Sequence, residues 1–600
     1  MAMSRTRKIV LIITGIVLVI FFFAALGIAM LFAAFRHSEP AIADNSVLVL
    51  RVSGSLPDYV PENPVRKIFG SDDQSLTGLL VQLKKAKVDR RIRAVLLDID
   101  MPGGGWAKAD EIRDAIADFR SSGKPIYAYM ELGFNREYYI ATACDRIYIP
   151  PVGDLFINGL AAEAMFFRGS LDKLGIQADV FQIGKYKNAP DMFTRKNMSD
   201  AQREVINSIL DDYFGRYVSA VAETRHKSPD EVRSLIDSAP FNARQAQDTG
   251  LIDGAKYRSE IEDELKQQLG YKPSDHLHLV KGSDYREVSP ESLGLNTGER
   301  IAIIYASGEI DSGRSNDGLL GEQTAGSDTV VKALNDARDD RTVKAIVLRV
   351  DSPGGSSYAS DLIWHAVEEA RQKKPVVVSM SDLAASGGYY ISCNASRIVA
   401  EPSTITGSIG IFAGKPVMKG FYDWLGISNE YVMRGKNAGM FRETEPFSTD
   451  ERARFEDLIR RTYYEDFVPK VAKGRNKNPE YIDSVGQGRV WTGAQGQSNG
   501  LVDEFGGLDR AVEIAKQLAG IPAQKSVHRV VFPYPRTFFE RLFGNDDEEE
   551  NGANVHVQQQ RAAIAALPED VQRSLRYAAM LDRMKRGDMM ALMPFELRIR

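Results

Sequence analysis

The chain carries an internal repeat, and this repeat limits the folds open to it more than any other feature. Residues 93–104 read RAVLLDIDMPGG and residues 344–355 read KAIVLRVDSPGG, an offset of 251 positions. The same offset relates YYIATACDRIYIPP to YYISCNASRIVAEP further along the chain. Because 600 residues are too many for one hydrophobic core, we predict two copies of one domain, at 45–285 and 300–535. The polar string SPESLGLNTGE is the predicted linker between them.

Within each copy, short apolar runs rich in β-branched residues alternate with stretches of helical periodicity. In the second copy AIVLRVD and PVVVSM are predicted strands, and ASDLIWHAVEEARQ between them has the apolar spacing of a helix. This alternation predicts an α/β fold with mainly parallel sheets. The two cysteines, Cys144 and Cys393, are too few for a disulfide framework, and we expect both to be small buried residues.

The N-terminus has the composition of a membrane anchor. Residues 9–35 contain no charged side chain, and a membrane-spanning helix needs about 20 apolar residues. A cleaved signal peptide is the alternative, but its apolar part is shorter, about 7–15 residues. Three basic residues lie within positions 1–8, whereas Arg36 alone follows the apolar segment closely. This asymmetry predicts one transmembrane helix, with residues 1–8 in the cytoplasm and the rest of the chain beyond the membrane.

The C-terminal end also differs from the two copies. Residues 546–550 are all acidic and predict a solvated linker, and the string RAAIAALPEDVQRSLRYAAMLDRM has the spacing of amphipathic helices. We therefore predict that residues 540–600 are an acidic linker followed by a helical extension. The net charge of -5 for the whole chain argues against general binding of nucleic acid.

The two copies differ at a position where only the second could carry a nucleophile. The second copy reads LAASGGYYIS and the first LGFNREYYIA, so Asn135 stands where the second copy has Ser386. Small residues on both sides of Ser386 allow a tight turn between a strand and a helix, which would expose its hydroxyl and aim helix N–H groups at it. Ser386 is therefore the candidate nucleophile, and a simple helix cap is the alternative interpretation.

A glycine turn, DSPGG at 351–355, follows the preceding predicted strand. Paired glycines there allow backbone N–H groups to point outward, as an oxyanion hole requires. We expect the N–H groups of Gly354 and Gly387 to hold a developing negative charge. An ordinary turn is the alternative, and it is the interpretation we prefer for MPGG in the first copy.

A serine nucleophile needs a base, and the histidines show no catalytic motif. Neither HExxH nor any other metal-ligand spacing occurs, so we expect no metal and no other cofactor. Lysine can serve as the base when burial lowers its pKa by about 3–5 units from about 10.4. Lys187, in the mostly apolar string VFQIGKYKNAPDMF, is a candidate from its surroundings alone.

Five strings then identify a family. In chain order they are GKYKNA, DSPGG, AASGGYYIS, TGSIGIF and VWTGAQGQSNGLVDEFGG. Together with the N-terminal apolar segment they resemble the signal peptide peptidase A family in its long, duplicated form, over residues 45–535. The resemblance implies a fold of the Clp-protease and crotonase type in each copy. It also implies a Ser–Lys dyad built across the copies, with Ser386 as the nucleophile and Lys187 as the base, Ser408 orienting the lysine, and Gly354 and Gly387 as oxyanion donors.

The resemblance carries further expectations about the whole protein. It implies a homotetramer that is anchored in the inner (cytoplasmic) membrane by a single span, with its catalytic domains on the periplasmic side. The implied substrates are cleaved signal peptides and other short, extended peptides, and the implied reaction is their hydrolysis by a serine protease.

Three alternatives remain open at this stage. Lys436, in RGKNAGMF, is the second copy's counterpart of Lys187 and lies 50 residues after Ser386. A dyad using Lys436 would form within the second copy or between subunits, whereas a ring of alternating copies would set it opposite Asn135. The other two alternatives concern function: a crotonase-type acyl-CoA enzyme, or a membrane scaffold without catalytic activity.

Overall fold

The computed structural model of the protein describes residues 40–60, 74–316, 323–534 and 589–593, the single residues 15, 22, 567 and 572, and the backbone of 598–599. Apart from those single positions, the predicted transmembrane segment at 9–35 lies outside the described residues. So do the acidic run at 546–550 and almost all of the predicted C-terminal helices. Among the helices that are described, none has the length and apolar character needed to cross a membrane.

The first copy is built on a six-stranded sheet in which all neighbouring strands are parallel. Its strands lie in the order β10, β5, β3, β2, β1, β11. Their bounds are β1 (Ser46–Gly54), β2 (Ile92–Pro102), β3 (Ile126–Tyr129), β5 (Arg146–Ile149), β10 (Gly254–Ala255) and β11 (Leu279–Lys281). Helices α3 (Leu76–Val88) and α4 (Trp106–Arg120) pack on one face of this sheet and α11 (Arg258–Gln268) packs on the other.

The second copy repeats this order. Its strands run β22, β18, β17, β15, β12, β23, all parallel. The end of β17 also pairs in parallel with β19, and β19 pairs antiparallel with β21. Their bounds are β12 (Glu299–Ser307), β15 (Val343–Ser352), β17 (Val376–Ala385), β18 (Arg397–Ala400), β19 (Ile405–Gly407), β21 (Val490–Thr492), β22 (Glu504–Phe505) and β23 (Val527–Phe532). Helices α13 (Ser327–Asp339) and α14 (Ser357–Lys373) cover one face, and α21 (Leu508–Leu518) covers the other.

These two sheets confirm the predicted tandem α/β fold with mainly parallel strands. The strings AIVLRVD and PVVVSM lie in β15 and β17, and the predicted helix between them is α14. Both cysteines are buried and unpaired, as expected. The apolar runs predicted these strands correctly because strands covered on both faces by helices must be apolar along most of their length.

A third sheet joins the two copies. Its order is β14, β13, β16, β24, β20, β8, with bounds β8 (Gln177–Ile183), β13 (Glu309–Asp311), β14 (Thr324–Gly326), β16 (Gly354–Ser356), β20 (Ile411–Val417) and β24 (Met590–Leu592). Strand β8 comes from the first copy and pairs along seven residues, antiparallel, with β20 of the second. Strand β24 belongs to the region 540–600 and lies beyond the string for which amphipathic helices are predicted, so it leaves that prediction untested.

The remaining elements complete the two copies. The further strands are β4 (Leu132–Phe134), β6 (Asp154–Phe156), β7 (Ala162–Glu163), β9 (Phe241–Asn242) and β25 (Arg598–Ile599). The further helices of the first copy are α5 (Asn135–Ala141), α6 (Arg168–Lys173), α7 (Asp191–Thr194), α8 (Asp200–Arg225), α9 (Pro229–Ser238), α10 (Ala243–Asp248) and α12 (Gly282–Arg286). After a short 3-10 turn at Glu291–Leu293, the second copy adds α15 (Gly387–Ser392), α16 (Lys419–Leu425), α17 (Thr449–Arg461), the π-helical turn Thr462–Phe467, α18 (Val468–Arg475), α19 (Pro479–Val485) and α20 (Gly493–Ser498).

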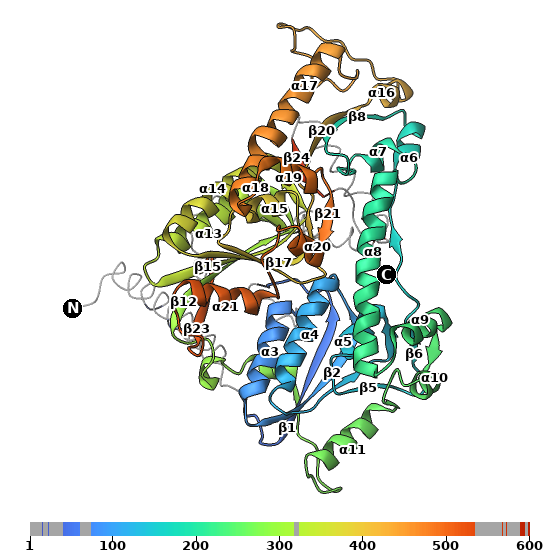
Figure 1. The fold of residues 1–600 in the computed structure, drawn as a ribbon, viewed down its shortest axis with the longest axis vertical. Helices are drawn as coiled ribbons and strands as arrows, with labels where there is room; N and C mark the ends of the chain where they lie inside the picture. The colour runs from blue at the N-terminus through green and yellow to red at the C-terminus, as the bar shows by residue number, and fades with distance from the viewer. Residues whose placement is uncertain are drawn as a thin grey trace, which may run out of the picture.

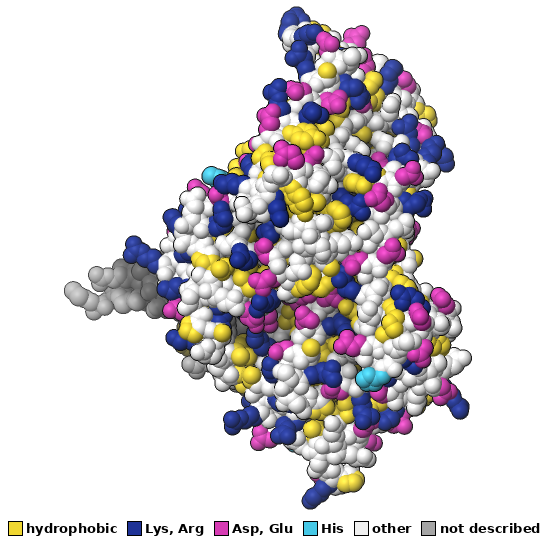
Figure 2. Space-filling model, viewed as in Figure 1, with side chains coloured by type: hydrophobic (Ala, Val, Ile, Leu, Met, Phe, Trp, Pro, Cys, Tyr) yellow, Lys and Arg dark blue, Asp and Glu magenta, His cyan; other side chains and the backbone are white. Residues whose placement is uncertain are grey.

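Figure 1 shows the first copy (blue to green) below the second (yellow to red), with the long helix α8 (teal) running along one side of both. Helix α8 binds the second copy directly: Arg216 donates to the carbonyl of Pro402 at 2.9 Å, and Gln495 donates to Ser208 Oγ at 3.0 Å. On the face drawn in Figure 2, basic and acidic side chains are interspersed, so this face has no broad patch of one charge. That mixture agrees with the small net charge of the chain.

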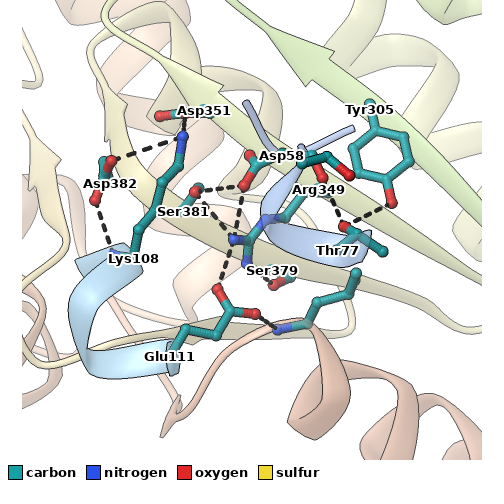
Figure 3. A network of polar contacts seen from close by, with 12 residues as sticks. Asp58, Thr77, Lys108, Glu111, Tyr305, Arg349, Asp351, Ser379, Ser381 and Asp382 are labelled. Atoms are coloured by element: carbon teal, nitrogen blue, oxygen red, sulfur yellow. Dashed lines mark hydrogen bonds and ion pairs between the residues drawn. The ribbon is translucent and has the colours of Figure 1, made fainter. Parts of the chain in front are cut away.

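A buried polar network ties the copies together beneath α4 (Figure 3). Arg349 of β15 donates to Asp58 at 3.0 Å and to Glu111 of α4 at 2.7 Å, and it also donates to Ser379 and Ser381 of β17. The guanidinium group is buried with both carboxylates. Because Asp58 and Glu111 belong to the first copy and Arg349 to the second, this network fixes one copy against the other.

Candidate active site

Ser386 lies in the turn between β17 and the short helix α15. Its backbone has φ 56° and ψ −110°, a conformation that non-glycine residues rarely adopt and that strained functional turns often contain. The Ser386 N–H donates to the carbonyl of Gly407 at 2.8 Å, and the N–H of Tyr390 donates to the Ser386 carbonyl at 2.8 Å. The predicted strand-to-helix turn is therefore confirmed.

One part of that prediction was wrong. The small flanking residues were expected to expose the Ser386 hydroxyl, but Ser386 is 0% exposed. The turn itself is open enough, and the hydroxyl is enclosed because chain segments distant in sequence pack over it. One of these segments contains Lys187, and another is β24, whose Ala591 carbonyl oxygen lies 3.1 Å from where a β-carbon on Gly387 would be.

Lys187 lies in the loop that leaves β8 and leads to α7. This loop is held against the second copy: the N–H of Tyr186 donates to the carbonyl of Gln487 at 2.8 Å. At Gly488 (φ +75°) a β-carbon would lie 2.5 Å from the backbone nitrogen of Lys187. Only a glycine permits such a close approach of two backbones, so Gly488 lets the first copy's lysine reach the second copy's serine.

The Lys187 amine is enclosed by hydroxyl and carbonyl oxygens. Its Nζ lies 2.7 Å from Ser386 Oγ, 3.1 Å from Ser408 Oγ and 3.1 Å from the Ser408 carbonyl oxygen. Lys187 is 0% exposed, and burial lowers its pKa well below the ordinary value of 10.5. A lysine in this state is available as a neutral amine, the form that accepts a proton.

Ser408 follows β19 in a second strained turn, with φ 51°. Its N–H donates to the carbonyl of Arg489 at 2.7 Å. Both of its oxygens therefore face Lys187 while its backbone is held by the segment next to Gly488. The three side chains singled out from the sequence, Ser386, Lys187 and Ser408, come together although they lie in different turns and different copies.

The two glycines expected to hold an oxyanion lie next to each other. A β-carbon on Gly354 (φ +101°) would lie 2.6 Å from the backbone nitrogen of Gly387. The N–H of Gly354 donates to Ser352 Oγ at 3.1 Å. For Gly354 to serve as an oxyanion donor, this hydrogen bond has to be exchanged for one to the substrate.

The repeat-related residues lie elsewhere. Lys436 is on the surface, where its side chain is 71% exposed and its Nζ is 2.7 Å from Asp450 Oδ2. Within one chain, Lys187 and not Lys436 reaches Ser386. Asn135, the counterpart of Ser386, donates to the carbonyl of Gly159 at 2.9 Å. Among the described residues, no group of His, Cys, Asp and Glu side chains is arranged to hold a metal ion.

Three acidic and basic residues beside this site were not found from the sequence. Lys108 of α4 lies 2.9 Å from Asp351 and 3.7 Å from Asp382, and Asp382 also accepts from the Lys108 N–H at 2.9 Å (Figure 3). Burial raises the pKa of Asp351 to about 6, with Lys108 opposing the shift. Since Asp351 begins DSPGG, this contact anchors the turn that contains Gly354. Only the pairing of two copies creates it, so no local sequence pattern could have shown it.

Several known proteins resemble this chain in sequence. Two stretches of equal length, 118–272 and 368–522, match Peptidase family S49. The chloroplastic serine protease SPPA of Arabidopsis thaliana is 35% identical over 505 residues, covering 84% of this chain and 73% of that protein. Protease 4 of Salmonella typhi is 34% identical over 538 residues, covering 86% of this chain and 84% of that protein. A solved ClpP1 of Listeria monocytogenes covers 34% of this chain and 92% of its own length at 17% identity, but its TM-score of 0.22 is too low to carry weight.

The matched stretches lie one in each copy and together cover more than half of the chain. They confirm the resemblance read from the motifs and remove the acyl-CoA enzyme and the scaffold as alternatives. The chain belongs to peptidase family S49 and is a serine peptidase.

Proposed function

We propose that Ser386 is the nucleophile of this peptidase and that Lys187 is its general base. The observation that carries this proposal is the 2.7 Å contact between Lys187 Nζ and Ser386 Oγ, with both side chains removed from solvent. A buried lysine with a lowered pKa can take the serine proton at neutral pH, which a solvated lysine cannot do. The dyad is shared, since one copy supplies the base and the other the nucleophile.

The reaction proceeds through an acyl-enzyme. Neutral Lys187 takes the hydroxyl proton as Ser386 Oγ forms a bond to the substrate carbonyl carbon. When the tetrahedral intermediate collapses, the C–N bond breaks and Lys187 gives its proton to the leaving amine. Water then attacks the ester, Lys187 takes a proton from it, and the proton returns to Ser386 as the second peptide product leaves as an acid.

Ser408 and the two glycines assist in different ways. Ser408 is a positioning residue, because its Oγ and carbonyl oxygen both lie 3.1 Å from Lys187 Nζ and orient the amine toward Ser386. The N–H groups of Gly354 and Gly387 stabilise the oxyanion, and one such donor contributes about 2.7–4 kcal/mol to transition-state stabilisation. The closeness of these two glycines supports a shared role.

We also propose where the peptidase works and what it cleaves. The uncharged segment 9–35 with basic residues before it anchors the protein in the inner membrane by one span, with both copies on the periplasmic side. Its substrates are remnants of cleaved signal peptides and other short peptides. A site enclosed on several sides, with Ser386 fully buried, admits an extended chain and excludes a folded protein.

Assembly into a homotetramer is part of the same proposal. Seven large apolar side chains are exposed along the segment formed by the end of α16 and the loop that leads to α17: Trp424, Leu425, Ile427, Tyr431, Val432, Met433 and Phe441. Exposed apolar side chains gathered on one projecting segment are typical of a subunit interface. This segment also contains Lys436, whose side chain is paired with Asp450 on the surface.

The test is hydrolysis of a fluorogenic apolar peptide by the full chain in detergent. Ser386→Ala and Lys187→Ala are expected to lose at least about 10³-fold in kcat/KM, because a nucleophile or its base is removed. Lys436→Ala is the matched control, since it removes the repeat-related lysine, and it is expected to retain the parent activity. Full activity in Lys187→Ala with loss in Lys436→Ala would instead assign the base to the second copy. Full activity in Ser386→Ala would overturn the proposed nucleophile.

A further inference from the structure

The side chain of Arg489 lies between the two copies, next to the loop that carries Lys187. Arg489 directly precedes β21, and its guanidinium carbon lies 4.8 Å from the centre of the Tyr186 ring and 4.4 Å from that of the Trp491 ring. Tyr186 precedes Lys187 in the first copy, whereas Trp491 lies in β21 of the second. A planar guanidinium favours positions over aromatic faces, so Arg489 connects the two copies beside the candidate base.

A carboxylate completes this arrangement. Glu204 of α8 accepts from Arg489 Nη1 at 2.5 Å, and its two oxygens lie 3.0 and 3.2 Å from the Tyr186 hydroxyl oxygen, which donates to them. The Arg489 side chain is 15% exposed. An exposed ion pair alone contributes little, whereas a guanidinium shielded by two rings is held more firmly. We refer to the four side chains of Arg489, Glu204, Tyr186 and Trp491 as the latch.

The backbone of Arg489 is bound to the turns that hold the two serines of the site. Its carbonyl accepts from the Ser408 N–H at 2.7 Å. The next residue, Val490, is paired in the register of β19 and β21 with Gly407, whose carbonyl accepts from the Ser386 N–H at 2.8 Å. The backbone of Arg489 is thus fixed within the second copy, while its side chain reaches the first.

Backbone contacts of the Lys187 loop converge on the same short segment of the second copy. The N–H of Tyr186 donates to the Gln487 carbonyl at 2.8 Å, and the N–H of Lys185 donates to Gln487 Oε1 at 3.2 Å. Gln487 lies two residues before Arg489. Removal of the Arg489 guanidinium would therefore loosen the loop at the place where the second copy holds it.

Lys187 depends on this closure because burial lowers its pKa. Its Nζ contacts the hydroxyl oxygens of Ser386 and Ser408 and the Ser408 carbonyl oxygen. The titratable and charged groups on the segments packed around the loop are Lys185, Tyr186, Asp191, Glu204, Tyr463, Asp483 and Arg489. None of these seven described groups forms a hydrogen bond with Lys187 Nζ. Entry of water would raise the pKa of Lys187 toward its ordinary value of 10.5.

We propose that Arg489 is a positioning residue of this peptidase, which holds the loop of Lys187 against the second copy and keeps water from the base. This inference rests on the proposed function, because it takes Lys187 to be the base. Arg489 acts through Tyr186, which precedes the base, and through its carbonyl bond to Ser408. Base and nucleophile are 199 residues apart in the chain, so contacts between the copies have to set their distance.

The experiment measures kcat/KM for a fluorogenic apolar peptide against pH, with the full chain in detergent. Arg489→Met removes the charge and the planar group. The acid limb of the profile is expected to move up by about one pH unit, a fraction of the about 3–5 units that burial can supply. At a pH below both limbs this is a loss of about tenfold, and activity is expected to recover in alkaline solution.

Arg452→Met is the matched control. Arg452 of α17 makes the same kinds of contact with β8, an ion pair with Asp179 and a position 4.6 Å over the Phe181 ring, but both partners precede the loop. Its pH profile is expected to match that of the parent. Tyr186→Leu tests the latch from the first copy and is expected to move the acid limb as Arg489→Met does. Arg489→Lys keeps the charge without the planar group, so its limb is expected between those of the parent and Arg489→Met.

Hydrogen exchange separates failure of this inference from failure of the proposed function, because it reports on the loop without catalysis. The backbone N–H groups of residues 186–188 all donate to carbonyls, and their exchange is followed by mass spectrometry in the full chain. It is expected to be about tenfold faster in Arg489→Met than in the parent, and unchanged in Arg452→Met.

The outcomes are then distinct. Exchange at the parent rate in both Arg489→Met and Tyr186→Leu, or an acid limb at the parent pH in both, overturns the positioning role. Parent activity in Lys187→Ala contradicts the proposed base whatever the exchange shows. Faster exchange in Arg489→Met would in that case still support the hold of Arg489 on the loop.

Discussion

Arg349 offers the sharpest test of how the two copies are held together. Its guanidinium is 1% exposed and donates to Asp58, Glu111, Ser379 and Ser381 at 2.7–3.0 Å. Burial alone would raise the pKa of Asp58, but the positive charges of Arg349 and Lys108 outweigh burial and lower it. At Glu111 burial outweighs Arg349, so the pKa of this carboxyl is raised. Arg349→Met keeps the length of the side chain and leaves both carboxylates buried without their cation. Breaking a buried ion pair in this way costs about 3–5 kcal/mol.

The repeat provides the control for this prediction. Asp98 occupies the position equivalent to Arg349 in the first copy and lies 3.0 Å from Arg258, but that pair is partly exposed. Arg258→Met is therefore expected to cost no more than about 1 kcal/mol.

The assay is urea unfolding monitored by intrinsic fluorescence. A chain of 600 residues does not unfold in one step, so the free energy of the first unfolding transition is compared between variants. Adding Glu111→Gln to Arg349→Met removes one unpaired carboxylate and is expected to recover part of the loss. An Arg349→Met chain as stable as Arg258→Met would refute the reasoning.

Three further predictions concern the dyad and the assembly. The pKa of Lys187 is lower in the folded chain than its ordinary value of 10.5, so between these two values only the unfolded chain holds the proton. The free energy of unfolding therefore rises with pH in this window, by up to about 1.4 kcal/mol per pH unit. Lys187→Met is expected to reduce this slope in urea titrations at several pH values, and an unchanged slope would contradict the lowered pKa. Gly488→Ala pushes the Lys187 backbone away and is expected to lower kcat by about 10²-fold, whereas Gly500→Ala, at another positive φ facing only the flexible end of Lys477, leaves kcat near the parent value. Val432→Asp on the exposed segment is expected to shift the sedimentation coefficient toward that of a single chain, and an unchanged value would exclude this segment from the interface.

The repeat made much of the fold predictable. Aligned copies predicted the parallel α/β sheets, and the substitution of Asn135 for Ser386 indicated which copy carries the nucleophile. Both conclusions depend on short-range patterns: β-branched runs, helical spacing and glycines around a turn. The strand-to-helix turn at Ser386 was accordingly predicted correctly.

Contacts between the copies were beyond the reach of such patterns. Lys187 and Ser386 are 199 residues apart, and from the residues alone nothing joined them; the pairing came from a family resemblance. The exposure of Ser386 was predicted wrongly because the covering segments belong to the other copy and to the C-terminus. Residues 590–592 are Met, Ala and Leu, all strong helix formers, yet they form a strand because two unpaired strand edges flank them.

The most direct test of the shared dyad is the pH dependence of labelling at Ser386 by a serine-directed phosphonate, located by mass spectrometry. Lys187 must be neutral to take the serine proton, so the labelling rate is predicted to rise with pH and to level off well below pH 10.5. Lys187→Met is predicted to abolish this labelling, and Lys436→Met to leave the rate and its pH profile unchanged. Labelling of Ser386 at the parent rate in Lys187→Met, or label on a different serine, would contradict the account.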